Sequence, residues 1–89
     1  MMIRTQDGRQ FGGTALQIVQ QMRALSCAPH LSLEEYAAWV ARNAKAADGA
    51  VIVVAGDDDE SRARSLIDAL VSAGLATAYV VDDYPKERR

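Results

Sequence analysis

Four consecutive carboxylates, Asp57, Asp58, Asp59 and Glu60, are the side chains whose type and spacing most directly suggest chemistry. Carboxylate oxygens suit hard divalent cations such as Mg²⁺, and ligands of open α/β sheets bind beyond the carboxyl ends of strands. The run follows a β-branched stretch, so it is a candidate cation or small-ligand site. The same residues also suit a helix start, with Asp57 as N-cap, Glu60 completing a capping box, and the acids favoured by the helix dipole. Capping is the interpretation that we prefer.

A second chemical pattern is Cys27-Ala28-Pro29-His30, which has the spacing of a pair of metal ligands. Zinc needs three or four protein ligands, and the chain contains one cysteine and one histidine. No glycine-rich phosphate-binding motif is present either. The sequence therefore predicts no metal site, no cofactor and no catalytic residue, and it favours a protein that is not an enzyme.

The aromatic residues Tyr36 and Trp39 are the remaining candidates, and they lie on an alanine-rich predicted helix. At helical spacing Trp39 falls beside the apolar face rather than within it. Aromatic side chains at such edges are typical anchors of protein interfaces, although packing at the edge of a monomer core explains them equally well. They are the predicted interaction residues.

The elements that must position these side chains begin with three helices. Capping-box patterns occur at Thr14 with Gln17, at Ser32 with Glu35, and at the acidic run described above. Each precedes apolar residues at a helical period. They predict helices over about 15–26, 33–47 and 58–73.

The predicted strands are shorter. Asp7-Gly8 between two strand-like pieces predicts an N-terminal hairpin with a type I′ turn. Residues 50–55 read Ala-Val-Ile-Val-Val-Ala, which is typical of a strand covered on both faces, and 78–81 predict a final strand. The predicted fold class is α/β (α+β): an N-terminal β-hairpin, two helices, then a parallel β-α-β unit, with a small mixed sheet packed against three helices.

Size and charge narrow the function classes. The 89 residues suit one domain, 1–89, with 85–89 as a frayed tail, and a chain this short gains from self-association. The formal net charge of −2 disfavours nucleic acid. No apolar stretch reaches the length of a membrane span, and a lone cysteine suits a reducing compartment, so we expect a cytoplasmic protein without a membrane partner.

Two further interpretations follow from these elements. The first two predicted helices, joined by a short turn, allow a helix-turn-helix, but Glu34 and Glu35 begin the second helix and would face phosphates. DNA binding is therefore a minor alternative. The main prediction is a non-enzymatic protein-interaction or homo-oligomeric module, such as a homodimer, and the cation or ligand site is the other alternative.

Two resemblances accompany these predictions. The stretch from Val51 through Asp57-Asp58 to Ala73-Gly74 resembles the first β-α unit of response-regulator receiver domains, in which an acidic pair holds magnesium. Here Ala55-Gly56 precede the acids, and one predicted strand follows the helix, so the resemblance supplies no phosphoacceptor. The run Asp7 to Arg23 resembles small bacterial proteins, some carried on phage-like or mobile elements. That resemblance implies a compact bacterial cytoplasmic domain and no activity.

Overall fold

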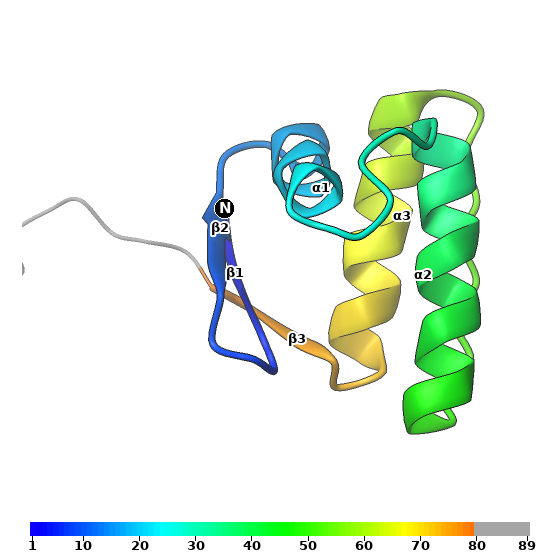
Figure 1. Ribbon diagram of the computed structural model, residues 1–89. Helices are drawn as coiled ribbons and strands as arrows, with labels where there is room; N and C mark the ends of the chain where they lie inside the picture. The colour runs from blue at the N-terminus through cyan, green and yellow to red at the C-terminus, as the bar shows by residue number, and fades with distance from the viewer. Residues whose placement is uncertain (80–89) are drawn as a thin grey trace, which may run out of the picture.

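The computed structural model describes residues 1–79, which form a small sheet beside three helices (Figure 1). The elements in chain order are β1 (Met2–Thr5), β2 (Gln10–Gly12), α1 (Ala15–Ala24), α2 (Leu33–Asp48), α3 (Asp59–Ser72) and β3 (Ala76–Tyr79). The predicted α/β class is confirmed, with its N-terminal hairpin and three helices. Residues 80 and 81 of the predicted last strand, and the predicted tail 85–89, lie outside the described residues.

The sheet is antiparallel throughout, in the order β2-β1-β3. Ile3 at its centre lies opposite Phe11 on β2 and Ala78 on β3, and the side chain of Ile3 is completely buried. The turn of the hairpin differs from the predicted type I′, because Gly8 has a positive φ of 87° and Asp7 does not. A single left-handed residue after the turn is sufficient here to join β1 and β2.

All three helices begin with a capping box. Those of α1 and α2 are the predicted Thr14–Gln17 and Ser32–Glu35 pairs. The third begins one residue later than predicted, because Asp58, not Asp57, accepts from the backbone N–H of Ser61 at 2.8 Å. The C-terminal ends of the helices agree with the predicted ones to within one or two residues.

Residues 50–55 were predicted as a central strand, and that element is wrong: the structure has no strand there, so the sheet is not mixed and contains no parallel β-α-β unit. Helices α2 and α3 run in the same direction, and the chain between them returns along their length (Figure 1). We call residues 50–55 the return segment. The sheet lies on the other side of α3, so within residues 1–79 no strand is within reach of this β-prone stretch.

Helix α3 is the centre of the packing. It contacts α1, α2 and β3, and Leu66 and Ile67 are among the largest fully buried side chains, together with Ile3, Ile18 and Val19. Ile52 of the return segment joins the same hydrophobic cluster. The described residues thus share one core, with the sheet and α1 on one side of α3 and α2 on the other.

Candidate interaction site

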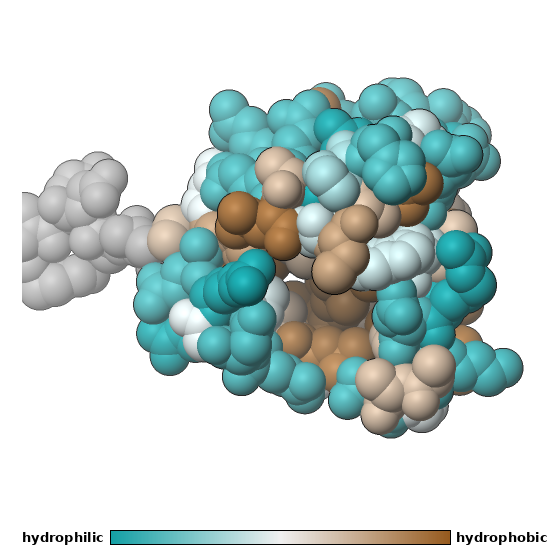
Figure 2. Space-filling view, viewed as in Figure 1, coloured by the Kyte–Doolittle hydropathy of each residue, from teal (hydrophilic) through white to brown (hydrophobic). Residues whose placement is uncertain are grey.

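An apolar groove opens between the hairpin, the end of α1 and the length of α2. Its volume is about 410 Å³. Figure 2 shows a hollow in this face of the molecule with hydrophobic residues at its floor. Phe11, Leu70 and Ala44 line it and are buried in the core, while Met22, Leu25 and Leu75 contribute further apolar surface. The lining of the groove is therefore mainly apolar.

Both predicted interaction residues line this groove. Tyr36 and Trp39 stack on one another, with ring centroids 5.8 Å apart and ring planes inclined by 22°. Tyr36 is buried, whereas Trp39 is half-buried and packs against the edge of the core. The three-residue spacing on one helix face brings the two rings together. The partly exposed ring of Trp39 therefore packs on the buried ring of Tyr36.

Tyr36 also brings a polar atom into apolar surroundings. Burial raises the pKa of its hydroxyl, and the nearby Arg23 guanidinium partly offsets that rise. Within residues 1–79 this hydroxyl has no hydrogen-bond partner. Water or a polar group of a bound molecule can supply that partner.

The rim of the groove was not predicted from the sequence. Leu25, just beyond the end of α1, keeps 61% of its surface exposed. On the opposite side, the hairpin loop contributes Asp7 and Arg9, which form an ion pair at 3.3 Å. The predicted first helix includes Leu25 on its apolar face. The sequence could not show that the hairpin loop approaches the same groove, because that approach depends on the tertiary fold. An exposed leucine and a charged loop therefore border the same groove as the aromatic pair.

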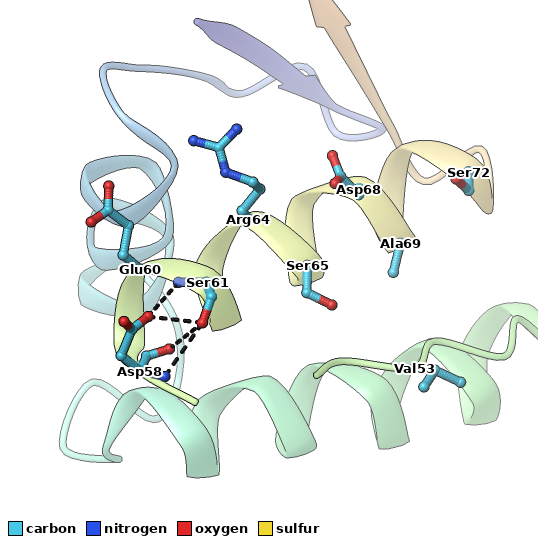
Figure 3. A pocket seen from close by; sticks show the side chains of 9 residues that line it. All are labelled: Val53, Asp58, Glu60, Ser61, Arg64, Ser65, Asp68, Ala69 and Ser72. Carbon is cyan, nitrogen blue, oxygen red and sulfur yellow. Dashed lines mark hydrogen bonds between the residues drawn. The ribbon is translucent and has the colours of Figure 1, made fainter. Parts of the chain in front are cut away.

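The acidic run has a different role in the structure. The Asp58 carboxylate accepts hydrogen bonds from the backbone N–H and the hydroxyl of Ser61, both at 2.8 Å (Figure 3). The backbone hydrogen bond is the main reason that the pKa of Asp58 lies below its ordinary value. Asp59 lies 3.6 Å from Arg62. Asp58 and Asp59 thus hold the first turn of α3 in place, as the capping interpretation requires.

The structure does not gather the acids around one point. In the part of the chain that the structure describes, no three His, Cys, Asp or Glu side chains are placed to hold a metal ion. Cys27 is exposed in the α1–α2 connection, and His30 is exposed in the same connection. Asp57 and Glu60 are likewise exposed and make no ion pair with another described residue. Divalent-cation binding at residues 57–60 stays a prediction without geometric support.

No helix within residues 1–79 is both long and apolar enough to cross a membrane. Comparison of the whole chain with protein-family models, curated proteins and solved structures found no match. The function must therefore be argued from the groove and the surfaces themselves.

Proposed function

We propose that this domain is a non-enzymatic protein-interaction module whose groove receives a large apolar side chain of a partner protein. The observation that carries the proposal is the stacked Tyr36–Trp39 pair in the wall of an apolar groove. Aromatic anchors over a partly buried floor are typical of the residues that dominate protein-binding energy. The free Tyr36 hydroxyl supplies one polar contact for the backbone of the partner.

The chemistry of the groove favours binding over catalysis. None of the buried residues among the described ones is charged, and the hydroxyl–carboxylate contact that borders the groove, Thr5 with Asp7, lies exposed in the hairpin turn. The free Cys27 thiol fits a reducing, cytoplasmic setting. The resemblance to small bacterial proteins fits the same setting and adds no activity.

Trp39 makes the proposal testable directly, because it is the only tryptophan in the chain. We would select helical peptides carrying leucine or phenylalanine on one face from a displayed library, using the purified domain as bait. Bound peptides should shift the Trp39 fluorescence to shorter wavelength, because they remove water from the ring.

The controls are two substitutions at the same position. Trp39→Ala should weaken the selected peptides at least about 10-fold, as expected for an interface anchor. Trp39→Phe keeps an aromatic ring on Tyr36 and should retain most of the binding, measured by labelled-peptide anisotropy. Selection of no peptide, or equal binding to the alanine variant, would contradict the proposal.

Self-association is a second candidate, and Leu25 is the observation that favours it. This exposed leucine borders the groove, so in a two-fold dimer each Leu25 reaches the groove of the other copy, as a self-complementary interface requires. Light scattering after size exclusion should then give a dimer for the wild type and a monomer for Leu25→Ser. Because dimerisation follows mass action, a monomer at a protein concentration of about 100 µM would exclude this candidate and leave the first.

A further inference from the structure

The return segment is an extended stretch that pairs with no strand of the described residues. Helix α3 has 14 residues and is about 21 Å long, and residues 49–58 must travel back along that length because α2 and α3 run in the same direction (Figure 1). Ten residues reach about 33 Å only when fully extended, so the turns at both ends leave the segment between them close to extended.

The side chains of the segment alternate as they do in a strand. Val51 and Val53 are 76% and 73% exposed, while Ile52 between them is buried at 7%. Val54 is half-buried against the core cluster. A two-residue period of exposure is the pattern of a strand with one covered face.

The backbone groups of the segment have almost no partners. The N–H of Ala55 donates to Ser65 Oγ at 3.0 Å, and the N–H of Ala50 donates to the Ala44 carbonyl at 3.2 Å. Between them, Val51 to Val54 make no hydrogen bond to any other residue of the described chain. Backbone groups alternate in direction along a strand, so those of Val51 and Val53 face α3, as the N–H of Ala55 does.

Space for another strand exists on that side. A hollow of about 610 Å³ lies between Val53 and the outer face of α3. Its floor consists of small side chains, Ser65, Ala69 and Ser72 (Figure 3). A neighbouring strand lies about 4.8 Å away, and short side chains obstruct it less than long ones would. No charge or proline within 50–56 protects the edge.

The charges around the hollow indicate which kind of peptide would bind there. Three carboxylates, those of Asp58, Glu60 and Asp68, border it together with one guanidinium, that of Arg64. The surplus is negative, so positively charged side chains complement it. We propose that the α3-facing edge of the return segment binds an extended basic peptide of a partner protein as an added strand, through the backbone groups of Val51 and Val53.

The edge is a separate surface from the groove, so this inference does not rest on the proposed function. A symmetric second copy fits the edge poorly. Antiparallel pairing across a two-fold axis would place the buried faces of both segments on one side, and the two α3 helices would then occupy the same space.

The test uses three fluorescein-labelled hexapeptides and the full chain. One alternates Lys and Val, the second has the same sequence with N-methylated valines, and the third has Glu in place of Lys. We expect the first to bind, measured by anisotropy. The N-methylated peptide should bind about 10- to 30-fold more weakly, since each lost backbone hydrogen bond costs roughly fivefold. The acidic peptide should bind at least about 10-fold more weakly.

The protein side of the test uses one position. Val53→Pro removes the N–H that points to α3 and should lose the peptide, whereas Val53→Ala keeps that N–H and should retain it. Circular dichroism checks that both variants fold. Hydrogen exchange should slow at Val51 and Val53 when the peptide binds and stay unchanged at Ile52. Equal binding of the N-methylated peptide, or no binding of the first, overturns the proposal. Results with the groove-binding peptides and with Trp39→Ala do not test this proposal, because the groove is a separate surface.

Discussion

Strand β3 and the return segment are two extended stretches on opposite sides of α3, and they satisfy their backbones in different ways. The residues of β3, Ala76 to Tyr79, pair with β1 over its full length. The Tyr79 hydroxyl also donates to Gln10 Oε1 at 2.9 Å, which ties β3 to β2 across the sheet. The return segment instead lies on helices. Its side chains make apolar contacts there, and its backbone donates only at its two ends, from Ala50 to the Ala44 carbonyl and from Ala55 to the Ser65 hydroxyl.

Burial of side chains and pairing of backbone groups are therefore independent requirements. Ile52 is nearly as buried as the sheet residues, yet the backbone around it is open to a partner. A helix surface can cover one face of an extended chain, but it has no free backbone groups to offer along the edge of that chain. The central strand β1 of the sheet is paired along both of its edges. The return segment instead has an edge to which another strand can be added.

The two regions should differ most in how much the truncation of one side chain lowers the free energy of unfolding. Ile3→Ala at the centre of the sheet should lower the free energy of unfolding by about 2–5 kcal/mol, because it leaves a cavity in a fully buried site. Val53→Ala in the return segment should change it by less than about 0.5 kcal/mol. Urea denaturation followed by circular dichroism measures both. A comparable loss in the two variants would show that the exposed valines are packed.

The next effect tests the anchor of the return segment. Gly56 has a φ of 145°, and a Cβ added there would lie 2.7 Å from the backbone nitrogen of Arg62. Gly56→Ala should therefore cost about 2–3 kcal/mol in unfolding free energy. Gly49→Ala is the matched control, since its positive φ remains but its Cβ meets nothing within 4 Å, and it should cost about 1 kcal/mol. Equal costs would mean that the turn at Gly56 moves freely.

A smaller effect follows from pH. The pKa values of Asp58 and Glu35 lie below their ordinary values, mainly because each carboxylate accepts a backbone N–H at a helix start, Asp58 from Ser61 and Glu35 from Ser32. A lowered folded-state pKa stabilises the fold above the unfolded-state value. The contribution should be complete above about pH 5 and decrease as the pH falls through about 4 and below. Thermal unfolding between pH 6 and pH 3 measures it, and a flat profile would contradict these caps.

The smallest effect distinguishes the cap from a cation site. Asp58→Ala should lower the unfolding midpoint by a few degrees, whereas Asp57→Ala should leave it nearly unchanged, because only Asp58 accepts from Ser61. The heat of magnesium titration should be negligible for the wild type. Magnesium heat that disappears in Asp58→Ala would show that the acidic run binds a cation after all.

Much of the fold could be predicted from the sequence because helix starts are local. Thr14 and Ser32 each find a capping partner three residues along the chain. The third helix shows the limit of local prediction, because its N-cap is Asp58 and not Asp57. Adjacent acidic residues and a nearby serine allow more than one capping box. The site was predicted in part: Tyr36 and Trp39 were named, but Leu25 and the hairpin loop that face them were not.

Local sequence signals account for the three helices, their apolar faces, the hairpin at Gly8 and the extended, β-branched character of residues 50–55. These features depend on contacts a few residues apart. Long-range packing is what pairs β3 with β1, leaves the return segment without a strand partner among residues 1–79, and brings the hairpin loop to the groove. The reason is that a strand or a groove needs a second surface, and which distant segment supplies it depends on how the whole core packs.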